Sequence, residues 1–417
     1  MKKFIFIFVA FVFLCSCEKD RKVKYQLDNT GVVIAAPYLW KTSLHQKEPA
    51  SNSFLKYPII YNDNILVPTT KGEDSRLLSL INTIDGSVLW RWNDLFRESE
   101  YIDIDYYHQY SNLVTYQYGG RSYCINMDNG ETYWKLRRNG SFDIRITSWG
   151  QYYFSQLVVM NEGKTGYNAE STYKGDILTG EISEFVTPNY TLRGIDCIRR
   201  IVFANPVPNQ ENLLLVSYYE APPDWIMQSY FGLYDTVSGV WLWERIETTP
   251  PQQSNNVWHQ PQIVNNKIYA AVCCSIVCHD LSTGKQLWKR NFSNDFMFSG
   301  FIIEDGRLIA NNEDCFTVCL NLENGSEQWR VKTAGTSGKM SYLNGIVYFV
   351  GGSVPRLFGI EASTGKIVWK IDAGLLDEGR GGKFRTNAVY VFPAKGNQPA
   401  KVIALSNMYA YCFEAYR

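Results

Sequence analysis

Residues 321–329 read NLENGSEQW, and the spacing within this stretch decides the fold. An amide or acidic residue stands first, a glycine follows four positions later, and a tryptophan stands four positions after the glycine. The complete pattern recurs as Asn82, Gly86, Trp90; Asn126, Gly130, Trp134; Asp235, Gly239, Trp243; Asp280, Gly284, Trp288; Asn321, Gly325, Trp329; and Glu361, Gly365, Trp369. A further copy has Asp176 and Gly180 but carries Glu184 where the others have tryptophan. Such equal spacing indicates a repeat architecture.

Each copy is typical of a β-hairpin turn. An Asn or Asp side chain can accept hydrogen bonds from nearby backbone amides where a strand ends. Glycine adopts the positive φ that the turn requires. The segment that follows, such as residues 366–371, is apolar or alternating like a strand. Its tryptophan then offers a large rigid surface for packing between neighbouring sheets.

Two further strand-like runs precede each turn, as residues 267–272 and 275–279 illustrate. Each unit therefore reads as a four-stranded antiparallel sheet. Successive motif starts lie between 40 residues (Asn321 to Glu361) and 59 residues (Asp176 to Asp235) apart. A sheet of this size cannot bury both faces alone, so the units must stack around an axis.

The two ends of the chain have complementary parts of one further repeat. Residues 401–415 match residues 307–322 in pattern, with Glu414 at the Asn/Asp position, but the chain stops before a tryptophan strand. Near the other end, residues 38–41 with Trp40 resemble that missing strand. We therefore predict an all-β fold, a single eight-bladed β-propeller over residues 32–417. Its four-stranded antiparallel blades are closed by the N-terminal strand, which completes the C-terminal blade.

The N-terminus has the features of an export signal. Lys2 and Lys3 precede an apolar run over residues 4–14, too short to span a bilayer as a mature helix. Residues 14–17 (LCSC) resemble a lipobox, which implies a signal peptide at residues 1–16, a lipid on Cys17 and a tether over residues 17–31. An ordinary signal peptide with incidental cysteines is the alternative. No other stretch reaches membrane-spanning length, so we expect lipid anchoring in the bacterial envelope, at either face of the outer membrane.

The repeat resembles the tryptophan-docking motif of quinoprotein dehydrogenases, whose Asp-x-x-x-Gly-x-x-x-Trp sequence recurs around an eight-bladed propeller. Together with the lipobox and the length of the chain, it resembles the propeller lipoprotein of the outer-membrane β-barrel assembly machinery. The resemblance covers residues 32–417 and implies envelope proteins as partners, with that assembly complex as one of them. The motif is specific for the fold and weak for function.

Composition and motifs limit the classes of partner and catalytic site that the chain can have. The 41 Lys and Arg residues balance 41 Asp and Glu residues, so no basic stripe points to nucleic acid. Cys124, Cys278, Cys319 and Cys412 share one repeat position and read as small apolar fillers of separate blades. No CxxC pair with zinc-finger spacing occurs, the four histidines are dispersed, and no GxSxG elbow or phosphate-binding loop is present. We expect no metal, no cofactor and no catalytic residue.

One pair of adjacent cysteines allows an alternative prediction, a bound cofactor. Some quinoprotein alcohol dehydrogenases, which this propeller resembles, hold pyrroloquinoline quinone (PQQ) against a disulfide between adjacent cysteines. Cys273 and Cys274 are adjacent, but they lie in the apolar run of residues 268–277, which predicts a strand rather than a loop. PQQ with calcium is the expected cofactor under this alternative alone.

The longest unit, between Glu184 and Trp243, offers a candidate binding loop. It carries inserts at residues 205–212 and 219–228, and the second contains Pro222, Pro223, Asp224 and Trp225. An exposed tryptophan on a rigid loop is a plausible anchor for a partner, whereas in the alternative it packs back on its own blade. Residues 97–110, rich in acidic residues and tyrosine, form a second contact loop or a solvated connection.

The sequence therefore predicts a monomeric, non-enzymatic, lipid-anchored scaffold that binds other envelope proteins. Two alternatives stay open. One is a degenerate or active PQQ-dependent oxidoreductase, and the other is a surface lipoprotein that binds glycans through exposed aromatic side chains.

Overall fold

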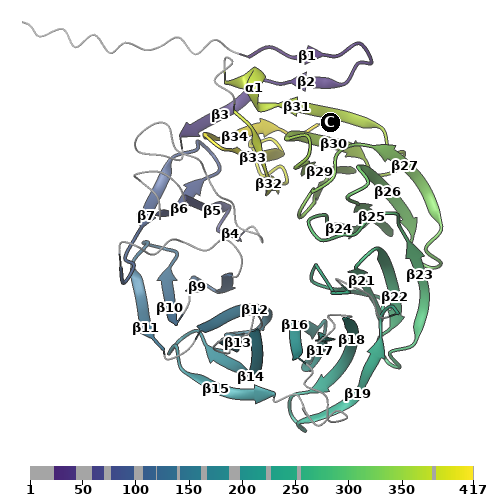
Figure 1. Ribbon diagram of the computed structural model, residues 1–417. Helices are drawn as coiled ribbons and strands as arrows, with labels where there is room; N and C mark the ends of the chain where they lie inside the picture. Colours follow the sequence, from purple (N-terminus) through teal and green to yellow (C-terminus); the bar gives the residue numbers. More distant parts are fainter. Residues whose placement is uncertain are drawn as a thin grey trace, which may run out of the picture.

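Eight β-sheets stand around a central axis and form a closed ring in the computed structural model (Figure 1). The structure describes residues 23–43, 59–69, 77–97, 107–118, 120–138, 141–160, 167–186, 198–221, 227–250, 255–377 and 382–416. Every strand pairing within the eight blades is antiparallel. The predicted eight-bladed propeller is confirmed.

The strands of the first four blades follow chain order from the channel outward. They are β4 (Ile59–Tyr61), β5 (Asn64–Thr69), β6 (Leu77–Asn82) and β7 (Val88–Trp92); β8 (Tyr107–Tyr110), β9 (Leu113–Tyr118), β10 (Arg121–Asn126) and β11 (Thr132–Arg137); β12 (Ser141–Trp149), β13 (Tyr152–Met160), β14 (Tyr167–Asp176) and β15 (Ile182–Val186); and β16 (Ile198–Val207), β17 (Gln210–Ala221), β18 (Gln228–Asp235) and β19 (Val240–Glu247).

The remaining blades repeat this order, and the last one borrows a strand from the N-terminus. They are β20 (Gln262–Val264), β21 (Lys267–Val272), β22 (Ser275–Asp280) and β23 (Gln286–Asn291); β24 (Phe301–Glu304), β25 (Arg307–Asn311), β26 (Phe316–Asn321) and β27 (Glu327–Lys332); β28 (Ser341–Leu343), β29 (Ile346–Val350), β30 (Arg356–Glu361) and β31 (Ile367–Asp372); and β32 (Phe384–Phe392), β33 (Lys401–Ser406), β34 (Tyr409–Glu414) and β3 (Tyr38–Ser43).

Each repeat motif forms the turn between the third and fourth strands of its blade. In the copy at residues 321–329, the Gly325 amide donates to the Asn321 carbonyl at 2.9 Å, and the Asn321 side chain accepts from the Glu323 amide at 2.8 Å. Gly325 has a φ of +68°. The motif glycines of the other copies also have positive φ, between +71° and +77°. The hairpin reading of the motif is thus confirmed.

The motif tryptophans join each blade to the next one. Six of these indole N–H groups donate to the backbone carbonyl of the residue that directly follows the first motif residue of the next blade. The pairs are Trp40 to Thr83 O at 3.0 Å, Trp90 to Met127 O at 2.9 Å, Trp134 to Ile177 O at 2.8 Å, Trp243 to Leu281 O at 3.1 Å, Trp288 to Leu322 O at 2.9 Å and Trp329 to Ala362 O at 2.9 Å.

The same tryptophans lie over the motif glycines of the following blade. A Cβ atom on Gly325 would stand 2.6 Å from Cε3 of Trp288, and one on Gly86 would stand 2.5 Å from Cε3 of Trp40. These glycines are therefore required twice, because the turn needs a positive φ and the indole needs the space of the missing side chain.

The junction between the third and fourth blades lacks this contact. Glu184 replaces the tryptophan, and the atom nearest to a Cβ on Gly239 would be the Tyr234 hydroxyl, at 3.7 Å. Phe185 lies instead between Phe154 and Tyr234, with ring centroids at 4.9 Å and 5.8 Å. Aromatic packing replaces indole docking at this junction.

The N-terminal strand β3 closes the ring, as predicted. It pairs antiparallel with β34, and Trp40 lies opposite Cys412. Lys41 on β3 places Nζ 3.7 Å from the buried carboxylate of Asp377 and 3.9 Å from the ring centroid of Tyr409. The closing strand is thus held by backbone pairing, by its indole and by an ion pair at the seam.

A short N-terminal hairpin precedes the closing strand. It consists of β1 (Gln26–Leu27) and β2 (Val33–Ala35), and β1 lies within residues 17–31, the segment expected to be a tether. β2 runs parallel to β31, with Val33 beside Trp369, and extends the seventh blade to six strands. The helix α1 (Ala373–Leu376) follows β31, capped by the Asp372 side chain.

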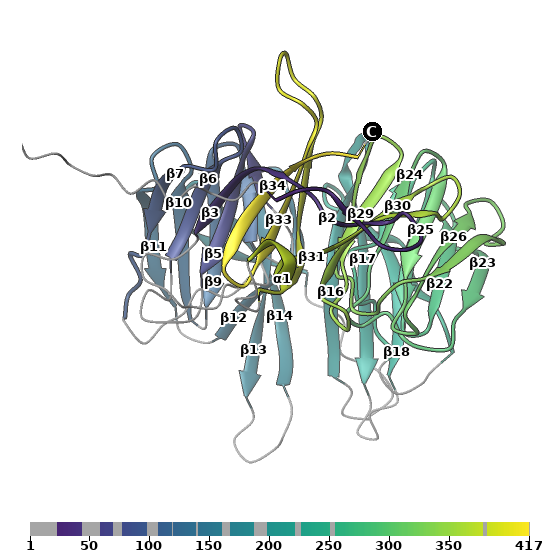
Figure 2. The ribbon, with the colours of Figure 1, turned by 90° about the horizontal axis from the view of Figure 1, so that it is seen from above.

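The two faces of the ring differ in relief (Figure 2). The connection between β32 and β33 protrudes from one face, while β13, β14 and β17 reach beyond the ring on the other face. Among the described residues, no helix combines the length and the apolar character needed to cross a membrane.

Two glycine substitutions separate turn strain from indole docking. Gly325→Ala adds backbone strain and a Cβ in contact with Trp288, whereas Gly239→Ala adds the strain with an open space around the Cβ. We expect Gly239→Ala to lower the free energy of unfolding by about 1–3 kcal/mol. Gly325→Ala should lower it by a further ~1–3 kcal/mol because of overpacking. Chemical denaturation measures both, and equal losses would contradict the docking role of the indole.

Removal of residues 26–45 tests the closure. The shortened chain loses β3, and loss of the Trp40 side chain alone should cost about 3–5 kcal/mol. We expect its thermal transition to move to lower temperature or to lose cooperativity, as followed by circular dichroism. A chain lacking residues 26–31 is the control, since it keeps β2 and β3 and loses two exposed strand residues. A closure-deleted chain that melts like the full chain would show that β3 does not hold the ring.

Candidate functional site

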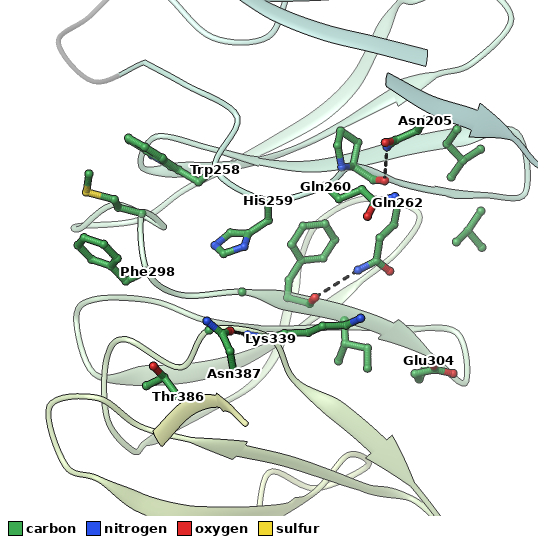
Figure 3. A pocket seen from close by; sticks show the side chains of 18 of the residues that line it. Asn205, Trp258, His259, Gln260, Gln262, Phe298, Glu304, Lys339, Thr386 and Asn387 are labelled. Atoms are coloured by element: carbon green, nitrogen blue, oxygen red, sulfur yellow. Dashed lines mark hydrogen bonds between the residues drawn. The ribbon is translucent and has the colours of Figure 1, made fainter. Parts of the chain in front are cut away.

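A cavity of about 810 Å³ opens in the central channel, between the inner ends of the fourth to eighth blades (Figure 3). Its wall comes from β16, β20, β24 and β32 and from the segments that lead into β20, β24 and β28. Those segments connect the outer strand of one blade to the inner strand of the next. The volume lies within the range of small-ligand sites, about 300–1,000 Å³.

Aromatic and apolar side chains form one end of the cavity. Figure 3 shows Trp258, His259 and Phe298 at this end. Phe298 is 56% exposed, and Met297 beside it in sequence is 40% exposed. Large apolar side chains left open to water in a concave site are typical of surfaces that bind a partner or ligand.

The opposite wall carries Lys339 together with Thr386 and Asn387 of β32. The Lys339 backbone amide donates a hydrogen bond to the Asn387 side chain. Gly338, with a φ of +59°, leaves the space for this contact, since a Cβ there would stand 1.9 Å from Asn387 Oδ1. The position of Lys339 is therefore fixed through its backbone, while its side chain is free to extend into the channel.

A partly buried polar network holds the two segments that carry Phe298 and Lys339. The Glu313 carboxylate accepts from the Ser299 hydroxyl at 2.5 Å and from the Thr336 hydroxyl at 2.9 Å, and the Thr336 amide donates to Ser299 Oγ at 2.9 Å. Gly300 packs against the Gly338 carbonyl, where a Cβ would stand at 2.4 Å. Charge-assisted hydrogen bonds and close backbone contact thus keep this part of the wall in one geometry.

Two further titratable groups face the cavity. Nε2 of His259 lies 3.0 Å from the Phe296 carbonyl, and because a carbonyl only accepts, that nitrogen carries a proton. Burial and the neighbouring Asp305 raise the pKa of the Glu304 carboxyl. Glu304 lies at the far end of the cavity from Trp258 and Phe298 (Figure 3).

The residues predicted from sequence do not line this cavity. Cys17 and the loop of Pro222, Pro223, Asp224 and Trp225 lie outside the described residues. The repeat residues lie at the junctions between blades. The inserts at 205–212 and 219–228 lengthen β16, β17 and β18, and β8 begins at Tyr107 within the acidic, tyrosine-rich segment.

The adjacent cysteines occupy a turn, which corrects the expectation of a strand. Cys273 and Cys274 connect β21 to β22, and Cys273 has a φ of +48°. Their Sγ atoms lie 3.5 Å apart as free thiols. Burial, followed by the neighbouring Cys274, raises the pKa of Cys273 to about 12. The apolar run was misleading because a two-residue turn of small apolar side chains interrupts two buried strands.

The cavity wall does not fit a PQQ–calcium pair. Calcium takes six to eight oxygen ligands, with carboxylates prominent among them. Of the described residues that line the cavity, Glu304 alone carries a carboxylate. The described part of the chain also contains no group of three or more His, Cys, Asp or Glu residues placed to hold a metal ion. The described lining of the cavity therefore lacks the oxygen ligands that the calcium ion would need.

Comparison with known proteins agrees with the geometry. The family model of outer membrane protein assembly factor BamB matches residues 316–396. The solved structure of BamB from Moraxella catarrhalis is similar at a TM-score of 0.57 and 13% identity, covering 90% of this chain and 98% of that one. This chain is a PQQ-repeat propeller that resembles BamB.

Other propellers share the architecture. Quinohemoprotein alcohol dehydrogenase from Comamonas testosteroni is similar at a TM-score of 0.64 and 11% identity, covering 91% of this chain and 77% of that one. Sqt1 from Saccharomyces cerevisiae reaches a TM-score of 0.58 at 9% identity, with 91% and 99% covered. No curated protein sequence matches the chain. At such identities the PQQ-repeat propeller shares the fold alone with these structures.

The cysteines give a direct test of the site chemistry. In protein isolated without reductant, we expect iodoacetamide at pH 8 to label the half-buried Cys274 and Cys315. Buried Cys273 and Cys412 should resist labelling until unfolding, because burial raises the pKa of each thiol to about 12 and thiolate is the reactive form. Peptide mass spectrometry reads the labelled sites. A native disulfide between Cys273 and Cys274 would contradict this expectation.

Proposed function

We propose that this PQQ-repeat propeller is a lipid-anchored, non-enzymatic scaffold of the cell envelope that binds other envelope proteins and assists the assembly of outer-membrane proteins. The observation that carries the proposal is the match of the BamB family model to residues 316–396. The matched stretch runs from β26 through β32, and it includes Thr336, Lys339 and Asn387 of the cavity wall.

The shape of the ring supports a binding role. Blades locked by docked indoles form a rigid support, and rigid scaffolds commonly carry function on their connections. The strands β13, β14 and β17 reach beyond the ring on one face (Figure 2). The candidate loop with Trp225 directly follows β17 along the chain, and we place the partner contact there.

A lipid anchor and a role that uses no cofactor belong to the same proposal. Cys17 stands six positions before Val23, and Val23 packs against the core of the seventh and eighth blades. A lipid on Cys17 would keep those blades within about 20 Å of the membrane, since an extended chain spans ~3.3–3.6 Å per residue. The scaffold needs no PQQ and no metal for this role.

Crosslinking in cells tests the proposal. A photoactivatable phenylalanine analogue placed at Trp225 should capture components of the barrel-assembly machinery, identified by mass spectrometry. The same analogue at Asn397, in the β32–β33 connection on the other face, is the matched control and should capture them at least about tenfold less.

Three outcomes have defined meanings. Loss of capture in a Cys17→Ser variant supports the anchored scaffold. Capture of glycan-uptake proteins, or capture of no protein at either position, would overturn the assembly role.

A further inference from the structure

Lys339 is an unpaired cation in the cavity wall. Among the described residues that line the cavity, it carries the one ammonium or guanidinium group. None of the ion pairs of the described chain includes it, although Glu304 lines the same cavity. Its Nζ also makes no hydrogen bond with a described residue. The charge is therefore left without a counter-charge.

The surroundings of Lys339 disfavour the charged form of its side chain. Lys339 is exposed to the channel, yet the blades around it partly desolvate its ammonium group and lower its pKa. The side chain is still open to the channel, so water there limits the shift. An anion within about 4 Å would favour the charged form and restore the lost solvation.

The end of the cavity formed by Trp258, Met297 and Phe298 needs a different kind of group. Its exposed apolar surface gains free energy when an apolar or aromatic side chain covers it. Both features line one cavity, so a ligand that satisfies them carries a negative charge and an apolar group on one short segment.

The wall is prepared for such a ligand before it arrives. Glu313 ties the segment of Phe298 to the segment of Lys339 through Ser299 and Thr336, and Asn387 holds the Lys339 backbone. Because these segments are already ordered, binding loses little conformational entropy at the wall.

We propose that the cavity binds an extended segment of a partner protein that presents an Asp or Glu carboxylate beside an aromatic or large apolar side chain. The carboxylate pairs with Lys339, and the apolar side chain packs on Trp258 and Phe298. The inference deepens the proposed scaffold function and rests on it for the choice of a protein segment over a small molecule.

Selection from a phage-displayed library of random decapeptides tests the site with purified full-length protein. We expect peptides with Asp or Glu next to Phe, Tyr, Trp or Leu to be enriched on the wild type. A selected peptide, measured by fluorescence anisotropy, should bind Lys339→Gln at least tenfold more weakly and should recover with Lys339→Arg. Lys332→Gln, on the exposed outer strand β27, is the matched control and should bind like the wild type.

A second variant covers the apolar end. Phe298→Ala removes an exposed ring, so the fold should persist, and it should weaken the same peptide about tenfold. Enrichment of peptides without an acidic residue, or equal binding to Lys339→Gln, would overturn the proposal. So would tight binding of PQQ or of an acidic glycan in place of any peptide. Because no cell is involved, failure here leaves the crosslinking result intact, and the reverse also holds.

Discussion

An indole set over a glycine is the contact on which this ring depends. Each docked tryptophan uses its N–H on a backbone carbonyl of the next blade and its face on a glycine that has no side chain to obstruct it. One contact thus satisfies a buried donor, fills the space between two sheets and fixes their relative rotation. Because it repeats from blade to blade, a small sheet that is marginal alone becomes part of a closed structure.

The same contact explains how far the sequence could be interpreted. The motif is local, so the glycine, the turn and the indole could be recognised from nine residues, and the number of blades followed from counting. The unpaired ends of the chain indicated closure because an open ring would expose strand edges. The turn at Cys273 was not predicted because its residues are as apolar as those of the strands on either side.

The cavity was not predictable in this way. Trp258, Phe298 and Lys339 stand in connections between repeats, where no period constrains the sequence. They meet only because the ring brings three such connections to one channel. The sequence does carry one signal, since the aromatic pair of Trp258 and His259, between prolines 251 and 261, interrupts the repeat. Nothing in the sequence, however, places this pair beside Lys339.

The way the N-terminal segment enters the ring has a mechanical consequence. A pull on the N-terminal end would first load the β1–β2 hairpin and the pairing of β2 with β31 on the seventh blade. It would reach β3, and with it the closure of the eighth blade, only after that hairpin had detached. The seventh blade therefore bears the tension first, and the pairing of β3 with β34, which keeps the ring closed, is loaded only afterwards.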